Sequence, residues 1–289
     1  MQLGPSELIL NADNSIYHLS LLPEDIADTI ITVGDPDRVW DVSKYFDFIE
    51  VEKNKREFRT HTGRLNDKRL TVISTGIGTD NIDIVMNELD ALVNIDFESR
   101  ALKPEQRSLD IIRIGTSGAI QEDIPLDSLL LSEFAMGFDN LLHFYDSEEI
   151  QFPDIQLAFI DQTEWSVFKS IPYVVRCDET LLTQLKSSQV QTGFTATNVG
   201  FYGPQGRNLR IAPEDENLKD KLTAFEFEGY RITNLEMETS GIYGLSRLLG
   251  HRAVSLNCIL ANRSTGEFSL HPEKAVDEMI QYALERLTT

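Results

Sequence analysis

Residues Leu109 to Ile120 place one arginine inside an isoleucine-rich run, and this combination limits how the chain can fold. The apolar run over 109–114 predicts a buried β-strand. A guanidinium is seldom buried without a partner, so Arg113 predicts a fixed anion nearby. We interpret the following Gly115-Thr-Ser-Gly118 as a turn whose N–H and hydroxyl groups could bind an oxyanion. A phosphate site is one interpretation, and an ordinary strand and turn with an ion-paired arginine is the other.

Length and composition favour a single globular domain over residues 1–289. Hydrophobic residues make up 41% of the chain and charged residues 25%, which suits one large core. The 26 Lys and Arg against 47 Asp and Glu give a formal net charge of −21, which disfavours nucleic acid and anionic membranes as partners. We find no signal peptide and no apolar run of about 18 residues, so we expect a cytoplasmic protein without membrane contact.

Predicted strands alternate with predicted helices, which indicates an α/β fold. Strands are expected at residues 29–33, 57–65, 69–73, 109–114, 129–134, 191–197 and 252–260, and helices at 39–45, 82–93, 181–185 and 272–287. Residues 233–238 end a further short strand and open a helix, and one interpretation of Glu236 and Glu238 is that they are only charges at this helix start. The acidic, proline-interrupted segment 144–165 is interpreted as an excursion or flap. The alternation predicts three layers, α/β/α, with a central mixed twisted sheet.

Small-residue turns follow several of these strands. They occupy residues 34–38, 74–78 and 200–207. In α/β sheets ligands bind beyond the strand ends, so the turns together predict one binding site. Each turn alone is also typical of a solvated loop.

Several familiar kinds of site are disfavoured by the sequence. The five histidines show no HxH or HExxH spacing and the two cysteines lie far apart, so no metal site is predicted. The GxSxG, GxGxxG and Walker patterns are missing, which argues against serine hydrolases, dinucleotide enzymes and NTPases. Arginines on glycine turns, aromatic residues and the pair Glu236 and Glu238 remain. This set suits a ligand with a phosphate, a planar ring and several hydroxyl groups.

Seven short motifs occur in order along the chain: Gly34-Asp-Pro-Asp-Arg38, Arg56-Glu-Phe58, Ser74-Thr-Gly-Ile-Gly78, Arg113-Ile-Gly-Thr116, Phe201-Tyr-Gly-Pro-Gln-Gly-Arg207, Glu236-Met-Glu238 and Asn262-Arg263. In combination they resemble the uridine phosphorylases of the nucleoside phosphorylase-I family, nearly from end to end. The resemblance implies the nucleoside phosphorylase fold and the phosphorolysis of uridine to uracil and ribose 1-phosphate.

The resemblance also implies a role for each site residue. Phosphate would be bound by Gly34, Arg38, Arg113 and Thr116, with Arg56 from a neighbouring subunit. The ribose would be held by Met237 and Glu238, with His18 from the neighbouring subunit. The uracil would contact Phe201, Gln205 and Arg207, with Arg263 behind them. Catalysis would depend on Arg113, Arg207 and Glu238.

The nature of the leaving base favours a pyrimidine. Uracil can depart as an anion solvated by Arg207 and Gln205, whereas purines usually need a proton at the ring. The purine branch of the family tends to place an Asp near the position of Asn262, and an amide cannot act as that acid. A purine nucleoside phosphorylase or a nucleosidase on the same fold stays open, as does a catalytically silent nucleoside-binding or storage relative.

The resemblance also bears on cofactors, on a cation site and on the assembly of subunits. Inorganic phosphate would be a co-substrate, and no other cofactor is expected. Bacterial relatives can bind a monovalent cation at the subunit interface; Glu57 matches that site, but Asn81 stands where serine is usual. We expect a homo-oligomer, either a dimer or a hexamer of dimers. Tolerance of deoxyuridine or thymidine stays open.

Overall fold

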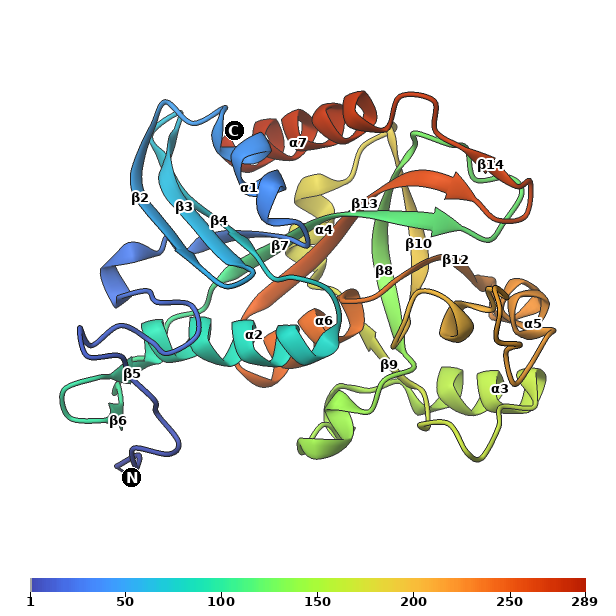
Figure 1. Cartoon of the computed structure of the whole chain (residues 1–289), viewed down its shortest axis with the longest axis horizontal. Helices are drawn as coiled ribbons and strands as arrows, with labels where there is room; N and C mark the ends of the chain where they lie inside the picture. Colours follow the sequence, from blue (N-terminus) through green and yellow to red (C-terminus); the bar gives the residue numbers. More distant parts are fainter. Residues whose placement is uncertain (1) are drawn as a thin grey trace.

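A 12-stranded mixed sheet forms the centre of the protein, whose computed structural model describes residues 2–289 (Figure 1). Its strands are β1 (Thr29–Val33), β2 (Phe48–Lys55), β3 (Phe58–Leu65), β4 (Lys68–Ser74), β7 (Asp110–Ala119), β8 (Leu129–Gly137), β9 (Tyr173–Arg176), β10 (Val190–Thr197), β11 (Glu226–Phe227), β12 (Tyr230–Glu236), β13 (Arg252–Asn262) and β14 (Glu267–Phe268). Their order is β11-β12-β10-β8-β13-β7-β1-β4-β3-β2, with β14 beside β13 and β9 beside β8. A separate short hairpin joins β5 (Ile95–Asp96) to β6 (Ala101–Leu102).

Helices cover both faces of the central strands. They are α1 (Pro36–Ser43), α2 (Thr79–Asn94), α3 (Pro153–Thr163), α4 (Glu179–Leu185), α5 (Leu218–Ala224), α6 (Thr239–Leu248) and α7 (Pro272–Thr288). The pair α2 and α6 packs on one side, and α1, α4 and α7 pack together on the other (Figure 1). The predicted three-layer α/β/α architecture with a mixed twisted sheet is therefore confirmed. Within residues 2–289, none of the helices has the length and apolar character needed to cross a membrane.

Five strands of the sheet close on themselves. Strand β13 pairs with β7 and with β8, β8 pairs with β10, and β10 pairs with β12. Strand β12 then returns to β7, where Asn234 lies opposite Ala119 and Leu235 opposite Gly118. We call β7, β13, β8, β10 and β12 the strand ring. Closure removes the free edge of these strands and brings the ends of β7 and β12 together.

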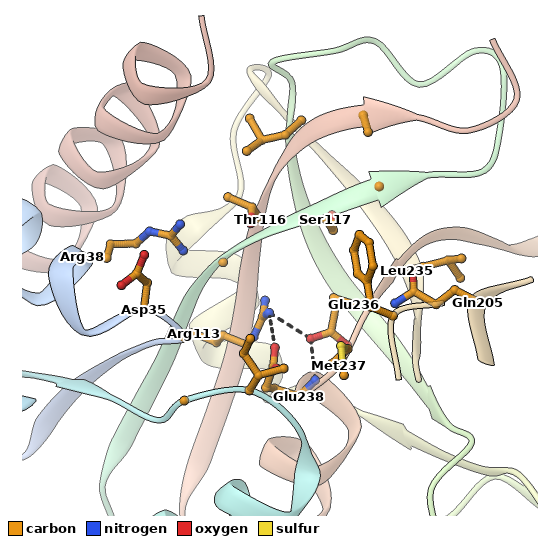
Figure 2. Close-up of a pocket in the computed structure, with 18 of the residues that line it drawn as sticks. Asp35, Arg38, Arg113, Thr116, Ser117, Gln205, Leu235, Glu236, Met237 and Glu238 are labelled. Carbon is orange, nitrogen blue, oxygen red and sulfur yellow. Dashed lines mark hydrogen bonds and ion pairs between the residues drawn. The ribbon is translucent and has the colours of Figure 1, made fainter. Parts of the chain in front are cut away.

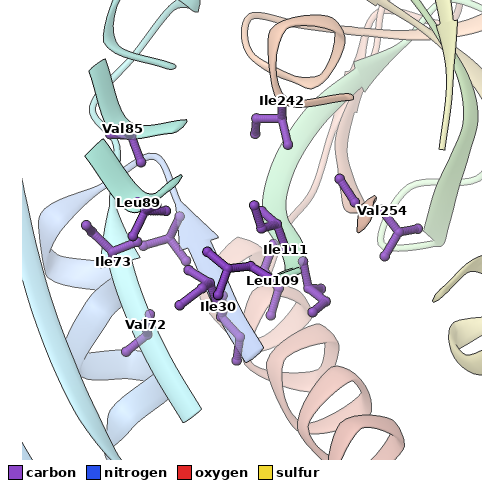
Figure 3. Packing of buried hydrophobic residues seen from close by; sticks show 14 of the residues in the cluster. Ile30, Val72, Ile73, Val85, Leu89, Leu109, Ile111, Ile242 and Val254 are labelled. Atoms are coloured by element: carbon purple, nitrogen blue, oxygen red, sulfur yellow. The ribbon is translucent and has the colours of Figure 1, made fainter. Parts of the chain in front are cut away.

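The core follows the apolar periodicity of the sequence. The predicted stripe on α2 is buried throughout, with Ile82, Val85, Met86, Leu89 and Val93 all fully enclosed. This stripe packs against the inner side chains of β1, β4 and β7 (Figure 3). A second cluster lies around α3 and α5 and is rich in phenylalanine.

The turn predicted at Gly115–Gly118 is wrong, because β7 continues to Ala119. Its backbone pairs with β13 through this segment, from Gly115 beside Asn257 to Ala119 beside Asn262. Long parallel pairing satisfies the N–H and C=O groups that a turn would have left exposed. These small residues therefore belong to a continuous strand, and Gly115 leaves room for the side chain of Arg113.

Other boundaries also differ from the sequence prediction. The segment 144–165 contains helix α3, whose Ile155 and Phe159 are buried in the second cluster, so it is not merely an excursion. Helix α1 begins at Pro36 instead of Val39, because the Asp35 carboxylate accepts a hydrogen bond from the Asp37 N–H and caps it. Strand β2 was not predicted. It is an edge strand whose residues alternate between exposed and half-buried.

Gly63 lies where β2 passes very close to β3. The register shifts between Ile49 and Val51, and a Cβ on Gly63 would lie 2.3 Å from the carbonyl oxygen of Phe48. Since this oxygen belongs to the backbone, we expect Gly63→Ala to lower the free energy of unfolding by about 1–3 kcal/mol, measured by denaturant titration. Gly203→Ala is the control, because its Cβ would meet open space. Equal stability of the two variants would contradict this account.

Candidate functional site

One cavity of about 760 Å³ opens beyond the carboxyl ends of several strands (Figure 2). Gly34 reaches it from the end of β1, Gly76 from β4, Phe201 from the loop after β10, and Met237 from the end of β12. Four segments that are far apart in the sequence therefore meet in one place, where ligands bind in open α/β sheets.

Most of the predicted site residues line this cavity. They are Gly34, Arg38, Arg113, Thr116, Phe201, Gln205, Arg207, Met237 and Glu238. Arg263 lies directly behind them, where its Nη1 donates to the backbone carbonyl of Gln205. His18 and Arg56 do not line the cavity of their own chain.

Arg113 belongs to a buried ion-pair cluster. Its Nη2 lies 2.7 Å from Glu238 Oε2 and 3.1 Å from Glu236 Oε2, and its Nη1 donates to Asn257 Oδ1 at 2.9 Å. The anion that the sequence predicts beside Arg113 is thus supplied by the protein itself. Burial opposes the charge of Arg113, but Glu236 and Glu238 outweigh it and raise its pKa. Burial also raises the pKa of Glu238, against the opposing effect of Arg113.

Gly115 makes room for this guanidinium. A Cβ at Gly115 would lie 2.1 Å from Nη1 of Arg113, so any side chain there would displace the arginine. The glycine that the sequence suggested was part of a turn is therefore required by close packing within a continuous strand.

The two glutamates where β12 ends and α6 begins have different surroundings. Glu236 Oε2 accepts from the N–H groups of Glu238 and Thr239 at 2.9 Å each, and Oε1 accepts from the Thr197 hydroxyl at 2.6 Å. Glu236 thus stabilises the start of α6, as the helix-start interpretation predicts. Glu238 Oε1 instead accepts from the Gly78 N–H at 2.9 Å, and Glu238 lies at the cavity wall.

Arg38 lies on the opposite side of the cavity from Gln205 (Figure 2). Burial and the charge of Arg113 lower the pKa of Arg38, and Asp35 and Asp41 counteract this only in part. Arg38 is thus an incompletely neutralised guanidinium, which favours an anion beside it. Gly34 and Thr116 line the same part of the cavity.

The loop end of the cavity, formed by Phe201, Gln205, Arg207 and Arg263, is also cationic. The Arg207 guanidinium stacks 3.8 Å from the centre of the Phe201 ring and donates to the Gln205 side-chain oxygen. Burial lowers the pKa of both arginines, and the charge of Arg207 helps to bring the pKa of Arg263 to about 10.

The carboxylates that line the cavity come from elements outside the loop end. They are Asp35, Glu57, Glu236 and Glu238. Asn262 is fully engaged in holding the segment after β13. Its Nδ2 donates to the carbonyls of Gln121 and Ile124, and its Oδ1 accepts from the N–H groups of Ser264 and Thr265.

His18 and Arg56 lie on other parts of the chain. His18 Nδ1 lies 2.7 Å from Glu88 Oε1 on α2. Arg56 is exposed in the turn between β2 and β3 with a φ of 56°, and the next residue, Glu57, lines the cavity together with Asn81. Within residues 2–289, no group of three or more His, Cys, Asp or Glu side chains is arranged to hold a metal ion.

The sequence interpretation missed several residues at or beneath the cavity. Leu260 and Phe268 form apolar parts of the cavity wall, and the buried Asn257 accepts a hydrogen bond from Arg113. Leu260 and Phe268 carry no signal in the sequence. Asn257 does, because it is an amide inside the apolar strand after Arg252, and such a residue needs buried partners.

Known proteins similar to this chain are nucleoside phosphorylases. The family model of the phosphorylase superfamily matches residues 28–288. The chain is 30% identical over 266 residues to a uridine phosphorylase from Thermococcus kodakarensis, covering 89% of this chain and 81% of the relative. It is 27% identical over 277 residues to a DeoD-type purine nucleoside phosphorylase from Buchnera aphidicola, covering 94% and 98%. The crystal structure of a Trypanosoma brucei nucleoside phosphorylase that shows uridine phosphorylase activity matches with a TM-score of 0.87 at 29% identity, covering 97% of this chain and 99% of that one.

Proposed function

This chain belongs to the phosphorylase superfamily, and we propose that it catalyses the phosphorolysis of uridine to uracil and ribose 1-phosphate. Its relatives act on either pyrimidine or purine nucleosides, since one is a uridine phosphorylase and another a purine nucleoside phosphorylase. The observation that carries the choice of uridine is the loop end, where two guanidiniums surround Gln205 and the lining carboxylates lie elsewhere.

The loop end suits a base that leaves as an anion. Negative charge grows on the departing base in the transition state, and the positive charges of Arg207 and Arg263 stabilise it where it develops. Uracil has two carbonyl groups over which the charge spreads. A purine would be helped by an acid, and the Asn262 amide is bound to backbone groups instead.

Phosphate, the co-substrate, binds in this proposal between Arg38 and Arg113. Guanidinium groups match phosphate oxygens in charge and geometry, and the Thr116 hydroxyl and the backbone at Gly34 lie in the same part of the cavity. A bound phosphate competes with Glu238 for the Arg113 guanidinium. The competition is relieved when ribose hydroxyls donate to Glu238 in place of Arg113. The proposal needs no cofactor besides phosphate, and it is compatible with a monovalent cation near Glu57.

The reaction passes through a ribosyl centre with the character of a cation. Phosphate held on one side of this centre is both nucleophile and stabilising charge, and holding both reactants together removes much of the entropic barrier. Glu238 accepts hydrogen bonds from the ribose hydroxyls, and Met237 packs against the sugar. The three-part ligand expected from the sequence thus has a part of the cavity for each component.

The first prediction is that the protein releases uracil from uridine only when phosphate is present, with little base released from inosine or adenosine. The reason is the acid-free loop end together with the arginine pair at the phosphate side. Base release is measured by chromatography over a panel of nucleosides. Equal turnover of inosine would favour a purine phosphorylase, and equal release without phosphate would favour a nucleosidase; either result overturns the proposal.

Arg207→Ala should slow the chemical step more than it weakens phosphate binding. Its guanidinium faces a base whose charge grows in the transition state, and removing one such donor typically lowers the rate by about 10²–10³. Steady-state measurements of kcat and of the KM for phosphate test this. Arg210→Ala removes the same charge from an exposed position three residues away and serves as the control. An Arg207→Ala enzyme with normal kcat and only a raised phosphate KM would refute the assigned role.

We further propose that the active site is shared across a two-fold dimer. His18 and Arg56 lie outside the cavity of their own chain, although the family resemblance gives both a role in the site. In a two-fold dimer each subunit gives and receives the same residues, so two complete sites form. The exposed position of Arg56 beside the cavity-lining Glu57 supports an arginine that reaches a neighbouring subunit.

Mixed dimers test this shared site. Arg56→Ala and Arg113→Ala should each be nearly inactive alone, but a mixed dimer has one site with both arginines intact. Random reassortment makes about half of the dimers mixed, so co-expression should restore roughly one quarter of wild-type activity. The control combines Arg113→Ala with Arg207→Ala, which line one cavity and should restore nothing. Restoration in neither combination would show that Arg56 acts within its own subunit.

A further inference from the structure

We propose that Asn257 is a positioning residue that fixes the Arg113 guanidinium at the cavity wall, an inference that rests on the proposed binding of phosphate by Arg113. Asn257 lies on β13, paired in register with Gly115 of β7, and its side chain is fully buried. A buried amide must find hydrogen-bond partners. One of its partners is the arginine that the proposed reaction requires.

The Arg113 guanidinium is held from two directions. Glu236 at the end of β12 and Glu238 just before α6 hold Nη2. On β13, Asn257 accepts from Nη1 at 2.9 Å and Ser255 Oγ accepts more weakly at 3.4 Å. With the carboxylates alone, the guanidinium would be free to tilt toward α6. The second anchor fixes the plane of the group and therefore the direction of the hydrogens that remain for a ligand.

The chemistry of an amide suits this role better than that of a carboxylate. Two carboxylates already contact Arg113, so a third would add negative charge where phosphate is proposed to bind. The Asn257 oxygen accepts the hydrogen bond without that charge. Arg113 is thus oriented without further negative charge at the position where phosphate is proposed to bind.

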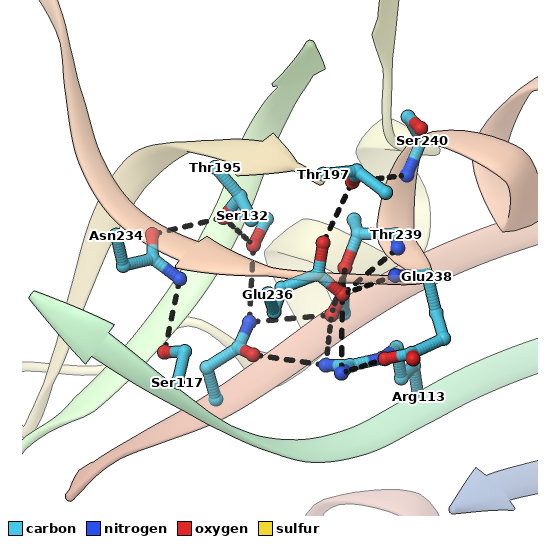
Figure 4. Close-up of polar contacts among 12 residues, drawn as sticks. Arg113, Ser117, Ser132, Thr195, Thr197, Asn234, Glu236, Glu238, Thr239 and Ser240 are labelled. Carbon is cyan, nitrogen blue, oxygen red and sulfur yellow. Dashed lines mark hydrogen bonds and ion pairs between the residues drawn. The ribbon is translucent and has the colours of Figure 1, made fainter. Parts of the chain in front are cut away.

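Asn257 is itself held by a side chain of the strand ring, Ser132, which belongs to a chain of hydrogen bonds with Thr195, Asn234 and Ser117 (Figure 4). Its Nδ2 donates to Ser132 Oγ on β8 at 3.1 Å, and Ser132 contacts Thr195 on β10. Thr195 donates to Asn234 Oδ1 on β12 at 2.9 Å, and Asn234 Nδ2 donates to Ser117 Oγ on β7 at 3.0 Å. The chain of bonds thus visits every strand of the ring and ends four residues beyond Arg113. Consecutive hydrogen bonds with one direction strengthen each other, so Asn257 is poorly able to rotate.

Asn257→Leu tests the inference because leucine has a similar size and cannot bond to Arg113. We expect the KM for phosphate to rise by about 10- to 100-fold, the range for losing a hydrogen bond to a charged group. The KM for uridine should stay within about twofold, since the carboxylates remain. A purely structural defect would raise both KM values or lower only the amount of folded enzyme. A folded variant with an unchanged phosphate KM would overturn the proposal.

Thr195→Val is the matched control. It removes a hydroxyl from the same chain of bonds but leaves the contact between Asn257 and Arg113 in place. Its phosphate KM should stay within about twofold of wild type. A rise as large as that of Asn257→Leu would show that the strand ring as a whole matters and would refute the specific role of Asn257.

If Asn257→Leu does not fold, Asn257→Asp tests the same proposal. An aspartate has the shape of asparagine and keeps an acceptor for Arg113, but it adds a third carboxylate. Its phosphate KM should rise by about tenfold or more, and no rise would overturn the proposal.

Calorimetric titration with inorganic phosphate alone separates this inference from the proposed function. If the wild type binds phosphate but does not cleave uridine, the proposed function is refuted. The phosphate affinities of the wild type and the Asn257 variant can still be compared in that case. Wild type that cleaves uridine, with Asn257→Leu binding phosphate normally, refutes only the role of Asn257.

Discussion

The burial of Arg113 is the physical constraint on which much of this structure depends. Removing a guanidinium from water is strongly unfavourable unless opposite charge and hydrogen bonds replace the water. Glu236 and Glu238 supply that charge. Glu236 is the last residue of β12 and Glu238 lies two residues beyond it, so β12 must end beside β7. The closure of the strand ring achieves this. The need to compensate the buried charge of Arg113 therefore links the ion-pair cluster, the pairing of β12 with β7 and the start of α6.

The same constraint explains where small residues occur. Gly115 has no side chain because the guanidinium lies over it, and this requirement is local to one strand. Gly34 in the turn after β1 lines the cavity with its backbone, and Gly206 in the loop after β10 adopts a φ of 68°, which favours glycine. Glycines that look alike in the sequence thus serve packing inside a strand in one place and loop shape in another.

The sequence predicts the fold well where periodicity is strong and poorly where it is not. The buried strand at Thr29–Val33 and the apolar face of α7 follow directly from their residue patterns. The charged edge strand Phe48–Lys55 carries too few apolar residues to stand out. The lining of the cavity by Arg38, Arg113 and Arg207 was predictable, because arginines on strands and glycine turns are conspicuous in an acidic chain. The pairing of Arg113 with the two glutamates was not, since it depends on the closure of non-adjacent strands.

The arginines that line the cavity contrast with the acidic surface of the protein, and this contrast has a functional consequence. A net charge of −21 disfavours the approach of polyanions such as nucleic acids. Electrostatic repulsion is screened within about 8 Å at physiological ionic strength, so a single phosphate ion can approach. Inside the cavity Arg38 and Arg113 lie closer to it than the surface carboxylates do. The distribution of charge is therefore compatible with a small anion and a neutral nucleoside as the substrates of this cavity.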